Sequence, residues 1–198
     1  MGEIYVCIDN NILEAYNINI EAKKGGNNMR KLQRILFVMV LCGSLSAGSL
    51  SEANAYVKNG YKLSAPKKIN FGIDASAGTY AGIIPTYTKI WGNYCSEIGF
   101  SSSASQVLHF EGYLTTDNDT YAVTYHSGND SHTIIFYKSF VGATAAEKQE
   151  TIVHEVGHVL GLAHCQASKN SSSVMRETGF NGKAYPLSDD ISGISAIY

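Results

Sequence analysis

Three histidines near the C-terminal end restrict the local fold of this chain more than any other feature of its sequence. Residues 154–164 read HEVGHVLGLAH, which places His154 and His158 four residues apart, one turn from each other on a helix. If the helix continued, His164 would point about 80° away from the direction of His154. The rings converge only if the chain turns first, and Gly161 permits the turn because glycine readily adopts the left-handed conformation that ends a helix.

Three neutral imidazoles that converge in this way can hold one metal ion. His154, His158 and His164 suit Zn²⁺ and leave its fourth tetrahedral position open for water, as in catalytic rather than structural zinc sites. Glu155 follows the first histidine directly, so it can accept a proton from a water that the metal acidifies. We therefore expect Zn²⁺ on the three histidines, Glu155 as general base, and attack of zinc-bound water on an amide.

These residues resemble the long zinc motif of the metzincin endopeptidases, and in particular the matrixin-like (matrix metalloprotease-type) secreted members of that clan. Farther along, Ser173-Val174-Met175 resembles the Met-turn of the family, which would place Met175 beneath the zinc. The segment from Pro186 to Asp190 resembles the end of a matrixin catalytic domain.

The resemblance implies an α+β fold of the metzincin type. Its twisted mixed sheet would be mostly parallel, with an antiparallel edge strand, two long helices and a short C-terminal helix. The resemblance also implies a secreted zinc-dependent metalloendopeptidase that cuts protein or peptide substrates. Two alternatives stay open, namely an inactive zinc-containing module that binds a protein partner and an amidase that acts on cell-wall peptides.

Residues 29–55 have the three-part layout of a secretory signal peptide. A basic start precedes an apolar stretch from Ile35 to Cys42, which is too short to span a membrane, and small residues form an A-x-A cleavage site that ends at Ala55. We expect export with cleavage after Ala55, no stable membrane anchor, and a catalytic domain over residues 56–198.

Residues 1–28 do not belong in front of such a signal peptide, which normally starts a chain. Lys24-Gly25-Gly26 back-translates to a purine-rich ribosome-binding sequence of bacterial type. We therefore expect translation to start at Met29, with residues 1–28 as a mis-assigned upstream extension.

The charge balance excludes a polyanionic partner. The whole chain holds 15 Lys and Arg against 17 Asp and Glu, and residues 56–198 hold ten against twelve, a net charge of −2 in both cases. We expect no nucleic-acid partner. With 44% hydrophobic residues and no repeat or linker, residues 56–198 predict one globular domain, which we expect to be a monomer.

Hydrophobic periodicity predicts the remaining elements. It gives a strand over 67–73, a core-facing helix over 80–98, and three further strands over 106–110, 121–125 and 132–140. A capping box of Thr144 and Glu147 begins the helix that carries the histidines, and Ser188 is expected to cap the last helix. By family resemblance, strand 132–140 would be the edge that pairs with an extended substrate.

Cys95 and Cys165 are the cysteines of the predicted mature chain, and an even pair in an exported protein favours a disulfide over two free thiols. Such a bridge would tie the first helix to the active-site loop. The alternative for Cys165 is a fourth metal ligand, because it directly follows His164.

Two polar segments are candidates for secondary metal sites. His126, Asp130 and His132 lie where matrixins hold a structural zinc, but an exposed polar turn is favoured. Residues 117–119, Asp-Asn-Asp, offer oxygen ligands suited to Ca²⁺, although such a loop is ordinarily a plain turn.

Overall fold

The computed structural model describes residues 56–117 and 119–198 of the chain. Its elements are η1 (Pro66–Lys68), β1 (Asn70–Ile73), η2 (Ala75–Tyr80), α3 (Ile84–Lys89), α4 (Trp91–Tyr94), β2 (Gln106–Tyr113), β3 (Ala122–Gly128), β4 (Ser131–Tyr137), α5 (Lys138–Gly142), α6 (Ala145–Val159), η3 (Ala167–Lys169) and α7 (Ser188–Ile197), where η marks a short 3₁₀ helix. No helix in these two stretches is long and apolar enough to cross a bilayer. The predicted signal peptide and upstream extension fall on residues outside the described ones, so they stay predictions.

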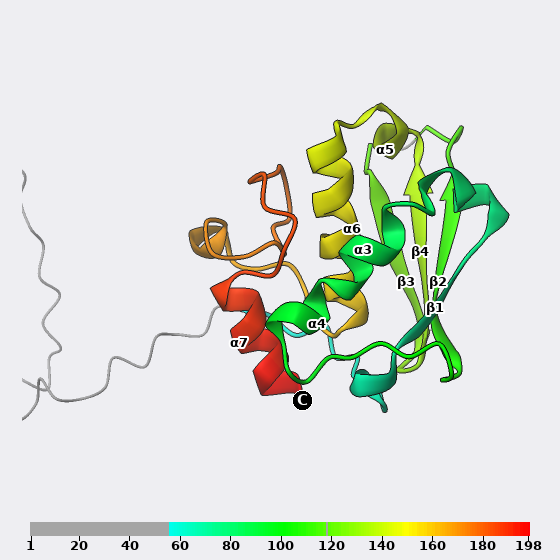
Figure 1. Cartoon of the computed structure of the whole chain (residues 1–198). Helices are drawn as coiled ribbons and strands as arrows, with labels where there is room; N and C mark the ends of the chain where they lie inside the picture. The colour runs from blue at the N-terminus through cyan, green and yellow to red at the C-terminus, as the bar shows by residue number, and fades with distance from the viewer. Residues whose placement is uncertain (1–55, 118) are drawn as a thin grey trace, which may run out of the picture. The chain divides into compact units, whose positions relative to one another are not determined.

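The four strands form one mixed sheet in the order β1-β2-β4-β3 (Figure 1). β1 and β4 both run parallel to β2, whereas β3 runs antiparallel to β4. This confirms the α+β fold with a mostly parallel sheet and an antiparallel edge strand.

The prediction that residues 132–140 form the edge strand was wrong. β4 lies between β2 and β3, so both of its edges are paired, and β3 is the edge strand. The burial of β4 gives the reason, because Ile134 and Phe136 are fully buried on one face while Ile135 and Tyr137 are nearly buried on the other. A strand that is apolar on both faces suits the interior of a sheet.

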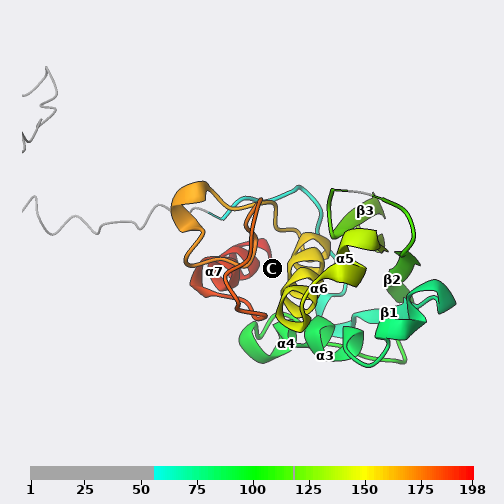
Figure 2. The same cartoon turned by 90° about the horizontal axis from the view of Figure 1, so that it is seen from above.

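Helices α3, α4 and α6 lie on the same side of the sheet, with α7 beyond α6 (Figure 2). The core between sheet and helices is aromatic. Phe136 stacks on Phe110 and on Phe140, with ring centroids 6.0 and 4.3 Å apart. The Trp91 Nε1–H donates to Val153 O of α6 at 3.1 Å, which fixes α4 against the helix that carries the histidines.

The helix predicted over 80–98 is divided into α3 and α4. Pro85 lies in the first turn of α3, where a residue without an N–H is tolerated, so the helix begins there rather than at Tyr80. Ile90 joins the two helices with helical dihedrals, φ −59° and ψ −29°. Of the two long helices expected, only α6, with 15 residues, is long within the described chain.

The ends of α6 and α7 follow from local hydrogen bonds. The capping box of α6 is present as predicted, with Thr144 N donating to Glu147 Oε2 at 2.7 Å and Glu147 N to Thr144 Oγ1 at 3.3 Å. Ser188 does not cap α7 but is its first residue. The Asp190 carboxylate instead accepts from Leu187 N at 2.8 Å, which satisfies the backbone donor that precedes the helix.

The predicted disulfide does not form, because Cys95 and Cys165 are both free and buried. Each thiol has surroundings of its own. Cys95 ends α4, where burial raises its pKa to about 12, and the Cys165 thiol lies 3.5 Å from Asn170 Oδ1. A buried thiol with a raised pKa stays protonated, and so is a poor metal ligand and a poor nucleophile.

The expected turn is exposed at Asn129, Asp130 and Ser131, but the two histidines beside it are covered. The two Nδ1 atoms lie 2.8 Å apart across the β3–β4 hairpin, His132 is 3% exposed, and Tyr61 stacks on His126. His132 Nε2 lies 2.8 Å from Asn129 O and must donate to it, so neutral His132 accepts at Nδ1 and His126 donates. The third member, Asp130, accepts from Ser64 N at 2.9 Å instead.

This histidine pair makes the domain sensitive to acid. Burial lowers the pKa of His126 to about 4 and also lowers that of His132, so between about pH 6.5 and 4 the unfolded chain binds protons that the folded chain does not. Stability should therefore fall as the pH falls through this window. Urea unfolding at several pH values should show a weaker fall for His126→Gln, and an equal fall in both proteins would contradict the assignment.

Candidate active site

Helix α6 presents His154 and His158 from successive turns on one face. Their ring centroids lie 4.8 Å apart, and the two Nε2 atoms approach to 3.2 Å. The other nitrogen of each ring meets a backbone carbonyl: His154 Nδ1 lies 2.8 Å from Val174 O, and His158 Nδ1 lies 2.8 Å from Leu162 O.

These carbonyls fix which ring nitrogens carry hydrogen. A carbonyl oxygen only accepts, so both Nδ1 atoms donate and both Nε2 atoms keep a lone pair. Burial lowers the pKa of His154 and of His158 to about 4, so both rings are neutral at pH 7. The two unprotonated nitrogens lie 3.2 Å apart, a separation at which both can bind one cation.

The turn that brings in the third ring follows the C-terminus of α6. Gly161 has φ +100°, its N–H donates to His158 O at 3.1 Å, and Leu162 N donates to Gly157 O at 3.0 Å. This pair of bonds is the Schellman motif that ends many helices. The chain then returns toward α6, so the His164 ring lies 5.2 Å from that of His154 and 4.9 Å from that of His158, centroid to centroid.

The histidine cluster fits a zinc ion. One ligand nitrogen from each of His154, His158 and His164 lies within 4.8 Å of the others, and no other group among residues 56–117 and 119–198 meets this criterion. With Zn–N bonds of about 2.0–2.1 Å and tetrahedral angles, two ligand nitrogens lie about 3.3 Å apart, close to the 3.2 Å between the Nε2 atoms.

Neither of the secondary metal sites receives support. Asp117 pairs with Lys138 at 2.9 Å, and its neighbour Asn118 lies outside the described residues. His126 and His132 bond to each other rather than converge with Asp130. The described part of the chain therefore gives no support for calcium or for a second zinc ion.

Glu155 is the acidic group of the site, and it is 6% exposed. Thr124 of β3 lies above it, with Oγ1 2.6 Å from the carboxylate Oε2 and 3.0 Å from Glu155 O. Burial raises the pKa of Glu155, while the nearby His158 and the Thr124 hydrogen bond oppose that rise. Thr124 thus orients a carboxylate whose affinity for a proton is higher than usual.

Met175 packs against α6 between the turns that carry His154 and His158. It is 1% exposed and lies on Gly157, which sits between the two ligand-bearing turns of α6. A Cβ at Gly157 would overlap the Met175 sulfur and press on Trp91. Close approach of the Met-turn to α6 therefore requires a glycine at this position.

Asp190 of α7 holds the Met-turn in place. Its carboxylate accepts from the Ser173 hydroxyl and, at 2.8 Å, from Val174 N. Val174 O is the acceptor for His154 Nδ1, so the position of this ring depends on α7 through two bonds.

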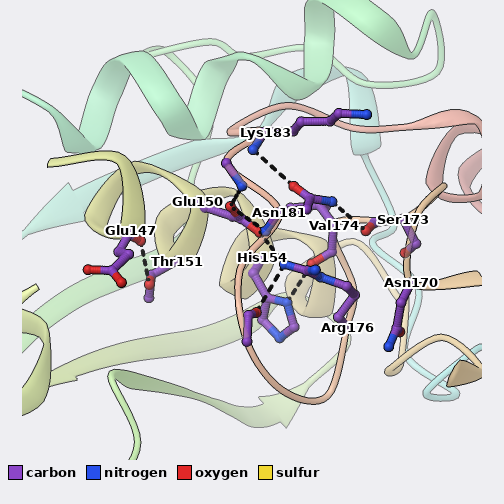
Figure 3. A network of polar contacts seen from close by, with 12 residues as sticks. Glu147, Glu150, Thr151, His154, Asn170, Ser173, Val174, Arg176, Asn181 and Lys183 are labelled. Carbon is purple, nitrogen blue, oxygen red and sulfur yellow. Dashed lines mark hydrogen bonds and ion pairs between the residues drawn. The ribbon is translucent and has the colours of Figure 1, made fainter. Parts of the chain in front are cut away.

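Glu150, one turn before His154 on α6, organises the loop after Met175 (Figure 3). Its carboxylate meets Arg176 Nη2 at 2.9 Å and accepts from Asn181 N at 2.9 Å and Gly182 N at 2.8 Å. The side chains of Glu150 and Arg176 are 3% and 11% exposed. A buried ion pair with further backbone donors therefore fixes this loop beside the histidines.

A cleft of about 640 Å³ runs over these residues. One wall is the edge strand β3 with the residues before it, and the other is the loop after Met175. The walls meet where Tyr121 packs edge to face on Phe180, 5.1 Å between centroids. His154, Glu155, His158 and His164 all line the cleft.

The family model described as Matrixin matches residues 97–198, just over half of the chain, from the segment between α4 and β2 to Tyr198 after α7. The chain belongs to the matrixin family. The family consists of metallopeptidases of the metzincin type with a catalytic zinc and peptide or protein substrates, so this matrixin is a metalloprotease.

Two solved structures share the fold of this matrixin. Myroilysin is 16% identical with a TM-score of 0.51, and the match covers 69% of this chain and 82% of that one. The ECX AB5 holotoxin in its GM1-bound form is 13% identical with a TM-score of 0.51, and the match covers 73% and 84%. At such identities the likeness shows the fold alone. No curated protein sequence matches this matrixin significantly.

The three histidines that the sequence groups do converge, but sequence reasoning missed the side chains that hold them. Thr124, Glu150 and Asn59, whose amide donates to His158 O at 2.8 Å, carry no motif of their own. The sole sequence signal is that Glu150 precedes His154 by four residues, which places the two on the same face of the predicted helix. A capping box and a hydrophobic stripe predict the helix but not the distant loop whose backbone N–H groups the Glu150 carboxylate binds.

The buried pair of Glu150 and Arg176 gives a stability prediction for this matrixin. We expect Glu150→Gln to lower the free energy of unfolding by about 3 kcal/mol, because it leaves the Arg176 charge buried without its partner. Adding Arg176→Met should recover part of the loss, since no buried charge then remains while Gln still accepts from the loop amides. Urea unfolding would measure both, and a double variant less stable than the single one would contradict the interpretation.

Proposed function

We propose that this matrixin is a zinc endopeptidase in which His154, His158 and His164 bind Zn²⁺ and Glu155 acts as the general base. One observation carries the proposal: two neutral imidazoles bring unprotonated Nε2 atoms to 3.2 Å from each other, with their Nδ1 atoms already bound to carbonyls. Hydrogen bonds at the far nitrogen are typical of metal-binding histidines.

When bound, zinc supplies Lewis acidity that lowers the pKa of a water to about 7 and polarises the scissile carbonyl. Glu155 takes a proton from the water that attacks the carbonyl carbon. As the C–N bond breaks, Glu155 returns that proton to the departing amine, so one water is consumed and a carboxylic acid and an amine are formed. The Thr124 hydroxyl, 2.6 Å from Oε2, keeps the carboxylate directed during both transfers.

The substrate would lie in the cleft as an extended chain beside β3. One edge of β3 pairs with β4, and its other edge forms the margin of the sheet. Residues Ala122, Val123 and Thr124 of this strand line the cleft, so a peptide that pairs with them passes over Glu155. Main-chain hydrogen bonds of this kind bind peptides of many sequences, as an endopeptidase requires.

The decisive test is Glu155→Gln. We expect zinc content of one ion per chain to persist while cleavage of casein falls by about 10²–10⁴-fold, because the histidines remain and the base is lost. Glu147→Gln is the matched control, since it makes the same change two turns earlier and glutamine preserves the capping box.

Full activity in Glu155→Gln would contradict the assignment of the base. A wild-type protein that binds zinc but cleaves neither casein nor cell-wall peptides would favour the binding-module alternative. Cleavage of the wall peptides alone would favour the amidase.

We also propose that the protein is exported, with translation from Met29 and cleavage after Ala55. The basic, apolar and A-x-A segments of residues 29–55 support this proposal. N-terminal sequencing of the exported protein should begin at Tyr56. A peptide from residues 1–28 among the proteins of the cell would contradict the start at Met29.

A further inference from the structure

The first residues of the described chain pair with the turn that leads to His164. We call residues 57–59 the N-terminal strap. Its backbone forms two hydrogen bonds with this turn, from Ala163 N to Val57 O at 2.7 Å and from Asn59 N to Gly161 O at 3.0 Å. The strap therefore lies along residues 161–163, which connect the second and third histidines.

The Asn59 side chain adds contacts that the backbone cannot make. Its Nδ2 donates to His158 O at 2.8 Å and lies 3.2 Å from Leu162 O, while its Oδ1 accepts from Tyr61 N at 3.0 Å. Both donor positions and the acceptor are thus in use. This donor and acceptor pattern selects an amide, because a carboxylate would set its oxygen against two carbonyl oxygens.

The two carbonyls that Asn59 binds belong to the histidine site. Leu162 O is also the acceptor for His158 Nδ1 at 2.8 Å, so Asn59 and the His158 ring share one oxygen. His158 O closes the turn through Gly161 N, and Asn59 holds it from the outside. The Asn59 side chain thereby fixes Leu162 O, which accepts from the His158 ring, and also the turn at Gly161 that precedes His164.

The strap has a second anchor that does not reach the histidines. Lys58 Nζ donates to Ala196 O of α7 at 2.7 Å. Lys58 and Asn59 are adjacent in the chain, but they bind different parts of the fold. Variants of these two residues therefore distinguish an effect of strap attachment in general from an effect of the Asn59 contacts with His158 O and Leu162 O.

We propose that Asn59 is a positioning residue for the metal site, which holds His158 through Leu162 O and His164 through the turn at Gly161. The proposal rests on the proposed function, because it requires these histidines to be the zinc ligands. Groups that hydrogen-bond to metal ligands commonly contribute 10–100-fold to metal affinity, and Asn59 holds such a group, Leu162 O. The N-terminal strap would thus slow the release of zinc although it supplies no ligand.

The test compares zinc release from the full chain and its variants after mixing with an excess of a coloured chelator. We expect release about 10–100-fold faster for Asn59→Asp, with a smaller increase for Asn59→Ala, which removes the donor without adding a carboxylate. Lys58→Ala, the matched control, should release zinc at the wild-type rate. The visible spectrum of the Co²⁺-substituted protein should change for the Asn59 variants alone, which reports the ligand geometry independently of activity.

Wild-type release rates in both Asn59 variants would overturn the inference. So would faster release in Lys58→Ala of the same size as in Asn59→Asp, because attachment of the strap would then be the cause. If Asn59→Asp does not fold, Asn59→Ala, which keeps the backbone bonds of the strap, decides the question. A wild-type chain that binds no zinc would overturn the proposed function itself, an outcome distinct from these.

Discussion

The Nε2 atoms of His154 and His158 lie 3.2 Å apart, and both stay unprotonated while the Nδ1 atoms donate to carbonyls. Both rings are half-buried and line the cleft. A cation bound by both nitrogens would stabilise them at this separation. The surrounding elements can be understood as the structure that keeps these two rings in position.

The groups that hold the site come from distant parts of the chain. Val174 O, which orients His154, belongs to the Met-turn that Asp190 of α7 fixes. Leu162 O, which orients His158, is held by Asn59 near the start of the described chain. These hydrogen bonds to the two rings therefore form only when the C-terminal helix and the N-terminal strap are both packed on the domain. Folding of the domain and assembly of the site are thus coupled.

Two of the wrong predictions concerned contacts between elements rather than the elements themselves. The strand at 132–140 was recognised, but its position depends on which neighbours cover its two faces. Cys95 and Cys165 were paired by number alone, whereas a disulfide depends on where their elements pack. The helix predicted over 80–98 is a local exception, because Pro85 favours a start at Ile84 rather than at Tyr80.

Sequence by itself determined what depends on spacing along one helix. Two histidines four residues apart share a face, a capping box fixes the start of α6, and Gly161 ends it with a positive φ, because these are local consequences of backbone geometry. Tertiary structure alone decided what orients those side chains. Thr124 reaches Glu155 across 31 residues and Asn59 reaches His158 across 99, and such pairs are set by the packing of a whole domain rather than by periodicity.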